Sequence, residues 1–485
     1  MRKLAVLLLL CTSSAFGAGI APAEYAARRA RLASQAGPNA IVFVFSAPVA
    51  HRNGDVDYPF RQSDNLLYLT GIAEPETTLV LLPDEPKEIL FVRDRNPRQE
   101  LWTGKIPTHE EVTAASGVKT VESSTRAEGF LGTAVDGAPY TFGSAPPPSY
   151  RSPAFPAFLR AVREGRAEVW VAFPSRRRDD PASAEQQFAA EAARRFPDLK
   201  VRDATPLLRA MRVIKSPAEI ALLERAIQVS DAGQKAGMKR ALTAKTENEV
   251  QATIEYTFRN MGACCLGYPS IVASGANATT LHYVRDDAPI VRDGLMLVDV
   301  GAEVEGYTAD VTRTYPASGK FTDLQRSVYE AVLKSQEASL ALMRPGHTFR
   351  EMNDKAVEVL GGELLRFGLI SKNEPAQVRW YLPYPIAHQI GLDVHDVVEP
   401  GTPFLANMVV TNEPGIYVRQ DDVTSSETFK ALPAAEQQSI RAALEKYNGI
   451  GVRIEDDVLI TEGEPRLLSS NSPRIVAEIE RLLGP

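Results

Sequence analysis

Cysteine is scarce in this sequence, which has three cysteines among 485 residues. Two of them, Cys264 and Cys265, are adjacent, and adjacent cysteines rarely bridge each other, so a disulfide framework is excluded as the support of the fold. Their spacing also differs from that of a metal finger. We therefore expect both side chains to be buried as small apolar groups.

Excess positive charge and long apolar runs are lacking as well. The net charge is -7, whereas proteins that bind nucleic acid carry basic faces, so nucleic acid is excluded as the expected partner. No apolar run is long enough to cross a bilayer, so we expect no stable membrane insertion. The remaining composition is that of a soluble globular protein, and the chain is long enough for two domains.

The first residues differ from the rest of the chain. Two basic residues precede a short apolar run, and Ala15 and Gly17 occupy the -3 and -1 positions of a cleavage site. This pattern is typical of a secretory signal peptide over residues 1–18, which predicts export to the periplasm or the medium. The alternatives are a lipoprotein anchored through Cys11, although Leu10 is large for the residue before a lipidated cysteine, and an ordinary N-terminal segment.

Residues 19–203 alternate between helical and strand patterns, which indicates an α/β domain. Residues 23–35 have the spacing of a basic amphipathic helix, and residues 40–46 form an apolar run typical of a buried strand. Further short apolar runs follow. A proline-rich stretch at 143–153 predicts a loop within this domain.

The pattern changes near residue 203, where we place the domain boundary. Ser216 followed by Pro217 is typical of a helix start, and Glu219 completes a capping box with Ser216. The second domain is expected to span residues 204–485.

Two aspartates lie in a predicted hairpin within this second domain. If the hairpin is centred on Val304 and Glu305, Asp299 falls directly opposite Asp310, and such residues share a face about 5 Å apart. Two carboxylates this close repel each other unless a positive charge lies between them. A metal ion would supply that charge, whereas the alternative is a pair of exposed acids.

Four further segments carry residues of the same chemistry. Histidine is scarce, with six in the chain, yet His388 and His395 lie within one short segment and His282 within another. Glu413 lies in the segment NEPGIY at 412–417, and Glu455 lies on an apparent strand at 451–461, where it alternates with apolar residues. Two aspartates, one histidine and two glutamates suit hard or borderline divalent ions, and two such ions can activate a shared water.

Several motifs together resemble one known family. They are LVDVGAE, GYTADVTRTYP, SIVASGANATTLHY, HQIGLDVHD, TNEPGIY and GIGVRIEDDVLIT, with FRQSDNLLYLTGIAEPE at 60–76. The chain resembles the proline-specific branch of the pita-bread metallopeptidases, which contains Xaa-Pro aminopeptidase (aminopeptidase P) and prolidase. The resemblance implies an α/β (α+β) protein with a creatinase-like N-terminal domain and a pita-bread catalytic domain.

The resemblance also implies a role for each motif residue. Asp299 matches the bidentate ligand of one metal, and Asp310 and Glu455 match the bridging carboxylates. His388 and Glu413 match ligands of the other metal, and Glu413 matches the general base for the bridging water.

Four more positions match residues that surround the metals. His282 and His395 match histidines that contact substrate and stabilise the intermediate. Tyr417 and Arg453 match positions behind the ligands, and we expect Arg453 to orient Glu455.

The activity implied by the resemblance is hydrolysis of the N-terminal bond before proline by two divalent ions, Mn²⁺ first, with Co²⁺ and Zn²⁺ as alternatives. The expected assembly is a homodimer or homotetramer. Two alternative functions stay open: a prolidase restricted to Xaa-Pro dipeptides, and a non-catalytic binding protein on the same fold.

Three features depart from the family pattern. Tyr384 stands where the family usually has a second histidine, and a tyrosine can donate a hydrogen bond but does not titrate near neutrality. The stretch after His395 is shorter than usual, and residues 418–449 form a longer insertion. All three lie near the expected cleft and bear on substrate specificity, where Tyr384 is a candidate substrate-binding residue.

Overall fold

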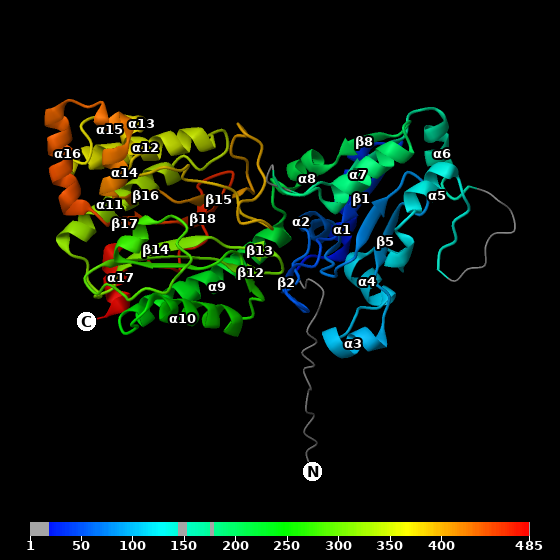
Figure 1. Ribbon diagram of the computed structural model, residues 1–485, viewed down its shortest axis with the longest axis horizontal. Helices are drawn as coiled ribbons and strands as arrows, with labels where there is room; N and C mark the ends of the chain where they lie inside the picture. Colours follow the sequence, from blue (N-terminus) through cyan, green and yellow to red (C-terminus); the bar gives the residue numbers. More distant parts are fainter. Residues whose placement is uncertain (1–18, 144–152, 175–178, 485) are drawn as a thin grey trace, which may run out of the picture. The chain divides into compact units, whose positions relative to one another are not determined.

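A computed structural model describes residues 19–143, 153–174 and 179–484 (Figure 1). The predicted signal peptide and most of the proline-rich loop lie outside the described residues. The chain forms two compact units, which meet in sequence between Met211 and Arg212. The sequence analysis placed this boundary at about residue 203.

The N-terminal unit is built on one mixed sheet of six strands in the order β6-β5-β4-β1-β7-β8. Their bounds are β1 (Ala40–Phe45), β4 (Thr78–Leu81), β5 (Glu88–Val92), β6 (Val121–Ser123), β7 (Glu168–Val171) and β8 (Lys200–Asp203), and a separate hairpin joins β2 (His51–Asn53) to β3 (Val56–Asp57). Strand β1 pairs antiparallel with β4 and parallel with β7, and its apolar residues are buried as expected.

Helices accompany this sheet along the chain. They are α1 (Pro22–Ala36), α2 (Asp64–Thr70), α3 (Pro97–Thr103), α4 (His109–Ser116), α5 (Phe130–Asp136), α6 (Pro156–Arg163), α7 (Ala184–Arg195) and α8 (Thr205–Arg212), with a 3₁₀ turn at Ser124–Arg126. The predicted helix at 23–35 is confirmed as α1. It is less exposed than its basic composition indicates, because Arg29 is buried in an ion pair with Glu88 at 2.6 Å.

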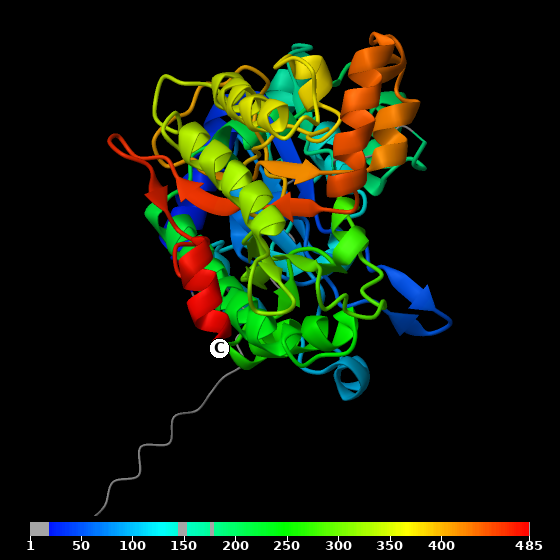
Figure 2. The same ribbon diagram turned by 90° about the vertical axis from the view of Figure 1, so that its left-hand side faces the viewer.

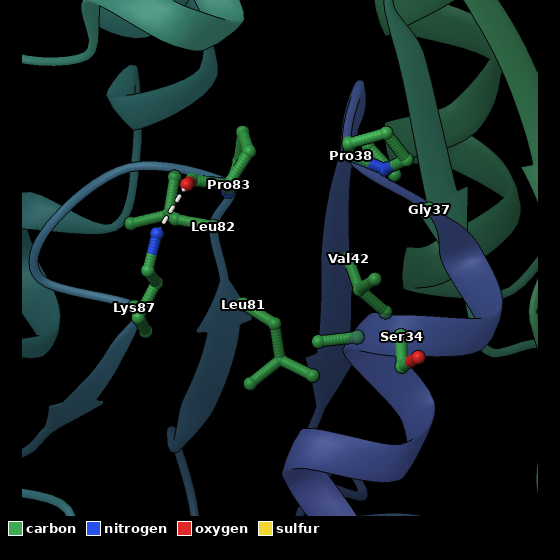
Figure 3. Close-up of a pocket in the computed structure, with 10 residues that line it drawn as sticks. Ser34, Gly37, Pro38, Val42, Leu81, Leu82, Pro83 and Lys87 are labelled. Carbon is green, nitrogen blue, oxygen red and sulfur yellow. Dashed lines mark hydrogen bonds between the residues drawn. The ribbon is translucent and has the colours of Figure 1, made fainter.

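A cavity of about 300 Å³ opens beside α1 in the N-terminal unit (Figure 3). Ser34 of α1, Val42 of β1 and Leu81 of β4 line it, so its walls are mostly apolar. None of the predicted site residues contributes to this cavity.

The second unit contains several small antiparallel sheets. Their strands are β9 (Cys265–Leu266), β10 (Ile271–Ser274), β11 (Leu295–Val300), β12 (Ala302–Val304), β13 (Tyr307–Thr308), β14 (Val311–Pro316), β15 (Val409–Asn412), β16 (Gly415–Tyr417), β17 (Gly451–Arg453), β18 (Asp456–Leu459) and β19 (Arg466–Leu467). The sheet orders are β10-β11-β14, β13-β12-β9, β15-β18-β19 and β16-β17.

Long helices flank these sheets, and α11 packs against β15, β16 and β17 (Figure 2). The helices are α9 (Pro217–Ala241), α10 (Glu247–Asn260), α11 (Asp323–Leu340), α12 (Phe349–Arg366), α13 (Pro375–Val378), α14 (Gln420–Ser425), α15 (Glu427–Lys430), α16 (Ala434–Tyr447) and α17 (Val476–Leu483), with a 3₁₀ turn at Gly275–Thr279. The predicted start of α9 is confirmed, because Ser216 and Glu219 form the capping box.

Two glutamines, one on α9 and one on α11, each donate hydrogen bonds to two backbone segments of this unit. Gln234 of α9 donates from Nε2 to the carbonyls of Val298 and Val311, at 3.0 and 2.7 Å. Gln336 of α11 donates to the carbonyls of Asn412 and Ile454, both at 3.1 Å. Each glutamine therefore ties together two backbone segments that carry the predicted acidic residues.

The predicted register of the hairpin is wrong by two residues. Asp299 lies directly opposite Thr312, and Asp310 falls in the short break before β14. The turn residues are Glu305 and Gly306, both with positive φ, as a two-residue hairpin turn requires. Because side chains alternate with a period of two, this slip keeps Asp310 on the same face as Asp299.

The insertion at 418–449 folds into α14, α15 and α16 and joins the core of the second unit. Phe429, Ile440 and Leu444 from these helices are fully or almost fully buried. The insertion is therefore an integral part of this unit.

The expectation that both cysteines are buried is also wrong. Cys264 is exposed and Cys265 is half-buried, because Cys264 lies just before the short edge strand β9 and Cys265 begins it. Among the described residues, no helix combines the length and apolar character needed to span a membrane.

Candidate metal centre

Three of the five predicted ligands form a tight buried group. Ligand atoms of Asp310, His388 and Glu455 all lie within 4.8 Å of one another. Glu413 joins them, because its Oε1 lies 3.3 Å from Nε2 of His388, which also lies 3.4 Å from Oδ2 of Asp310. Four segments far apart in the sequence therefore converge on one point.

Interruptions of the strands place these side chains. Asp310 lies between β13 and β14, and Glu455 lies between β17 and β18. The alternating pattern predicted one strand through 451–461, but the chain breaks there, and β17 and β18 pair in different sheets. Glu413 follows β15, and His388 is held beside that strand because its backbone N–H donates to the hydroxyl of Thr411 at 3.0 Å.

Asp299, the fifth predicted ligand, is linked to this group by a tyrosine. The hydroxyl oxygen of Tyr268 lies 2.6 Å from Oδ1 of Asp299 and 2.5 Å from Oδ1 of Asp310. The other oxygen of Asp299 forms an ion pair with Arg453, which is buried. The five predicted ligands are thus contiguous in space.

The electrostatics of the group suit divalent cations. Burial, followed by the charge of Asp299, raises the pKa of Asp310 to about 6. Burial and the neighbouring carboxylates raise the pKa of Glu455 well above its usual range. Asp299, Asp310, Glu413 and Glu455 lie together, whereas Arg453 forms its ion pair with Asp299, and such an excess of buried negative charge is unfavourable without further cations. The donor set of oxygens and one imidazole fits hard or borderline metal ions.

His388 presents the correct nitrogen toward the carboxylates. Its Nδ1 contacts the carbonyl of Gln389 at 3.1 Å, which leaves Nε2 facing Asp310 and Glu413. Burial by itself would lower the pKa of His388, but hydrogen bonds to Asp310 and Glu413 raise it well above its ordinary value. A backbone contact that fixes the ring of a metal-ligating histidine in this way is common in metal sites.

The two other predicted histidines are exposed beside this group. The ring of His395 lies 4.2 Å from that of His388, measured between ring centres. Burial and the neighbouring His388 lower the pKa of His395. His282 lies near enough for its charge to act in the same direction, so both histidines face the same region.

A buried ion cluster supports the segment that carries His395. Asp396 accepts hydrogen bonds from Lys215 at 2.9 Å and from Arg212 at 2.6 Å. Lys215 also donates to Oε1 of Gln389 at 2.9 Å. The cluster therefore fixes both ends of the segment between His388 and Asp396.

Tyr384, Tyr417 and Arg453 form a chain of hydrogen bonds. The hydroxyls of Tyr384 and Tyr417 lie 2.8 Å apart, and Arg453 donates to Tyr417 at 2.7 Å. Arg453 was expected to orient Glu455, but its ion pair is with Asp299. It reaches Glu455 only through Thr312, whose hydroxyl donates to Oε2 of Glu455 at 2.6 Å.

Several residues that support this group carry no signal in the sequence. Tyr268 and Thr312 contact its carboxylates directly, whereas Gln234 and Gln336 hold the backbone beside them. Only Thr312 lay within a motif that had been singled out. Tyr268 lies just before another such motif, but a tyrosine there gives no signal of its own.

Comparisons with known proteins agree with this geometry. The family model described as metallopeptidase family M24 matches residues 221–462, and the model of the aminopeptidase P N-terminal domain matches residues 25–141. The chain is 32% identical to the Xaa-Pro aminopeptidase of Haemophilus influenzae, over 97% of this chain and 99% of that protein. It is also 32% identical to human Xaa-Pro aminopeptidase 3, over 96% of this chain and 86% of that protein.

Solved structures give the same result. Aminopeptidase PepP of Pseudomonas aeruginosa superposes with a TM-score of 0.78 at 30% identity, covering 96% of this chain and 98% of that one. Aminopeptidase P of E. coli with the inhibitor Pro-Leu has a TM-score of 0.78 at 29% identity, covering 96% of this chain and 99% of that one. The expected α/β class and pita-bread catalytic unit are confirmed. The chain therefore belongs to the aminopeptidase P branch of metallopeptidase family M24, a family of metal-dependent peptide hydrolases.

Proposed function

We propose that this chain removes the N-terminal residue from peptides whose second residue is proline. The observation that supports this most strongly is the convergence of Asp310, His388, Glu413 and Glu455 on one point, with Asp299 linked to them through Tyr268. The relatives named Xaa-Pro aminopeptidase, which match the chain over nearly its whole length, support the proline specificity.

Two divalent metal ions are the proposed cofactor. The proposed ligands are Asp299, Asp310, His388, Glu413 and Glu455. When bound, the two ions lower the pKa of a water and polarise the scissile carbonyl. We propose Mn²⁺ first because the donor set is rich in carboxylates, with Co²⁺ and Zn²⁺ as alternatives.

The protein's own groups are proposed to bind, orient and move protons. Glu413 is the proposed general base, since it is less buried than Glu455 and Asp310 and lies beside His388. His282 and His395 are proposed to hold the substrate at the exposed side of the group. Arg453 and Tyr417 are proposed to position Asp299, and Tyr384 is proposed to act through Tyr417.

The discriminating experiment compares Xaa-Pro-Yaa tripeptides with Xaa-Pro dipeptides, each with added Mn²⁺, Co²⁺ or Zn²⁺. We expect release of the N-terminal residue from tripeptides. Cleavage confined to dipeptides would identify a prolidase instead, and no cleavage of either peptide under any metal would support the non-catalytic alternative. The match of the aminopeptidase P N-terminal domain supports the first outcome.

Two further properties are proposed on the basis of the sequence. Residues 1–18 are proposed to direct export, and the test is cell fractionation with sequencing of the mature N-terminus. The chain is proposed to form a homodimer or homotetramer, and the test is its mass in solution.

A further inference from the structure

The two cysteines lie opposite a buried glutamate. Strand β9 pairs antiparallel with β12 so that Cys265 is directly opposite Glu303. Directly opposed residues share one face of a sheet. Cys264 directly precedes β9 and contacts the same glutamate, because its Sγ lies 3.8 Å from the backbone carbonyl of Glu303 and 4.0 Å from its Oε1. One ligand atom from each of the three residues lies within 4.8 Å of those of the other two.

The burial of these residues leaves one side of the group open. Glu303 is 4% exposed and forms its inner side, Cys265 is half-buried, and Cys264 is exposed at the outer side. A cation from solvent would therefore approach the group from the side of the exposed Cys264 thiol. Cys264 and Cys265 are also the only cysteines after residue 11, so the thiols of this unit are gathered at one place.

The chemistry of this group differs from that of the metal centre described above. The five predicted ligands of that centre are carboxylates and one histidine, which suit hard or borderline ions. Thiolates with a carboxylate select softer ions, above all Zn²⁺ and its analogue Cd²⁺. The two groups lie on the same hairpin but share no residue, because Glu303 lies beyond Gly301 on β12 and Asp299 lies on β11.

We infer that Cys264, Cys265 and Glu303 form a second metal site, which takes a thiophilic divalent cation of the Zn²⁺ class. The cation forms two bonds to sulfur and one to a carboxylate oxygen, and the exposed side leaves a fourth position for water. The reaction is an exchange without electron transfer, in which two thiol protons leave as two metal–sulfur bonds form.

The Cys264 thiol carries a proton that such an exchange must release. The hydrogen bond with Cys265, followed by burial, raises the pKa of the Cys264 thiol above its usual range. The Cys264 thiol is therefore protonated at neutral pH, and a protonated thiol is a weak nucleophile. Cation binding should consequently release protons to the buffer.

The test is a Cd²⁺ titration of the reduced mature protein after it has been loaded with Mn²⁺. Cadmium thiolates absorb in the near ultraviolet through ligand-to-metal charge transfer, whereas Cd²⁺ bound by carboxylates and histidine does not. We expect this absorption to saturate at about one Cd²⁺ per chain, with release of about two protons in a weakly buffered solution. Added Zn²⁺ should compete and remove the absorption.

Three variants assign the signal to these residues. The double variant Cys264→Ser with Cys265→Ser should lose the absorption while its fold, measured by circular dichroism, is retained. Glu303→Gln should keep the absorption but bind Cd²⁺ about tenfold or more weakly. Glu305→Gln makes the same charge change on the same hairpin outside the group, and it should titrate like the wild type.

Three outcomes would overturn the inference. One is the absence of thiolate absorption although a thiol reagent counts two free thiols per chain. Another is absorption that persists in the double serine variant, which would place the ligand elsewhere. The third is an equal Cd²⁺ affinity in the Glu303→Gln and wild-type proteins, which would exclude the carboxylate from the site. None of these outcomes bears on peptide hydrolysis, so this inference and the proposed function fail independently.

Discussion

The hydroxyl oxygens of Tyr384 and Tyr417 lie 2.8 Å apart. Tyr417 accepts a hydrogen bond from Arg453, and Arg453 forms an ion pair with Asp299. The hydroxyl of Tyr384 also donates to the backbone carbonyl of Glu413 at 3.1 Å. Tyr384, which departs from the family pattern, is thus hydrogen-bonded to the backbone of the proposed base Glu413. Through Tyr417 and Arg453 it is also connected to the proposed metal ligand Asp299.

Removal of this hydroxyl should slow catalysis without loss of substrate binding. Tyr384→Phe keeps the ring but removes both hydrogen bonds, each worth about 1 kcal/mol, so we expect kcat to fall about fivefold or more with KM nearly unchanged. Tyr384→His, which installs the histidine implied by the family resemblance, should have a kcat between that of the wild type and that of Tyr384→Phe. A kcat for Tyr384→Phe equal to that of the wild type would mean that the tyrosine chain does not position Asp299.

Gln336, which holds the backbone beside two of the proposed ligands, should control metal affinity. Gln336→Met removes the amide that holds the carbonyls beside Glu413 and Glu455, so we expect metal affinity to fall by about tenfold. Gln325→Met is the matched control, because this residue of α11 is also buried and donates to a carbonyl, that of Asp293, at 2.7 Å. The control should lose stability but keep its metal affinity, as measured by competition with a chelator. Equal losses of affinity in both variants would contradict the assigned role.

The cluster around Asp396 should make Lys215 important for stability. Lys215 is 1% exposed, and Lys215→Met leaves a buried carboxylate with Arg212 as its remaining cationic partner among those described here. Leaving a buried charge with no partner costs about 3–5 kcal/mol, and because Arg212 still pairs with Asp396 we expect a loss of about 2–3 kcal/mol. Unfolding by guanidinium should show a loss of this size, and a loss below about 1 kcal/mol would argue that the pair is not stabilising.

The same carboxyl gives a pH dependence of definite sign. Burial would raise the pKa of Asp396, but Lys215 and Arg212 lower it below its ordinary value. A carboxyl with a lowered pKa in the folded state stabilises the fold above its unfolded pKa of about 4 and loses this contribution as the pH falls below that value. Lys215→Met should therefore flatten the decline of stability below pH 4, which thermal unfolding across that range can measure.

Asp286 should change the stability of the fold with pH in the direction opposite to that of Asp396. Its side chain is fully buried, and burial raises its pKa to about 7. Since the folded state then binds a proton more tightly than the unfolded state, stability should decline between pH 4 and pH 7. Asp286→Asn removes this titration and also tolerates the positive φ of this position. The variant should gain about 1 kcal/mol or more over the wild type between pH 4 and pH 8, and a constant difference across that range would contradict the assignment.

Capping residues and hydrophobic periodicity predicted the helices and strands whose formation depends on residues close together in the sequence. Ser216 caps α9 through Glu219, and α1 and β1 occur where the periodicity placed them. The hairpin register was less accessible, because it depends on the positive φ of Glu305 and Gly306. The error did not separate Asp299 from Asp310, since a slip of two residues preserves the face.

Contacts between distant segments could not be predicted in this way. Gln336 bonds to residues far along the chain, and Tyr268 links the carboxylate of Asp299 on β11 to that of Asp310 before β14. A glutamine in a helix or a tyrosine in a loop has no sequence signature for such a role. Only the resemblance to a known family placed the five acidic and histidine side chains together before the structure was known.

The most direct test of the central claim is the metal content of the purified protein, measured by elemental analysis before and after treatment with a chelator. Hydrolysis of an Xaa-Pro-Yaa tripeptide is assayed in the same samples. We predict about two divalent ions per chain, loss of hydrolysis when they are removed, and its return when Mn²⁺ is added. Glu413→Ala, which removes a proposed ligand and the proposed base, should bind less metal and not turn over. A protein that binds no metal, or hydrolysis that persists after complete removal of metal, would contradict this account.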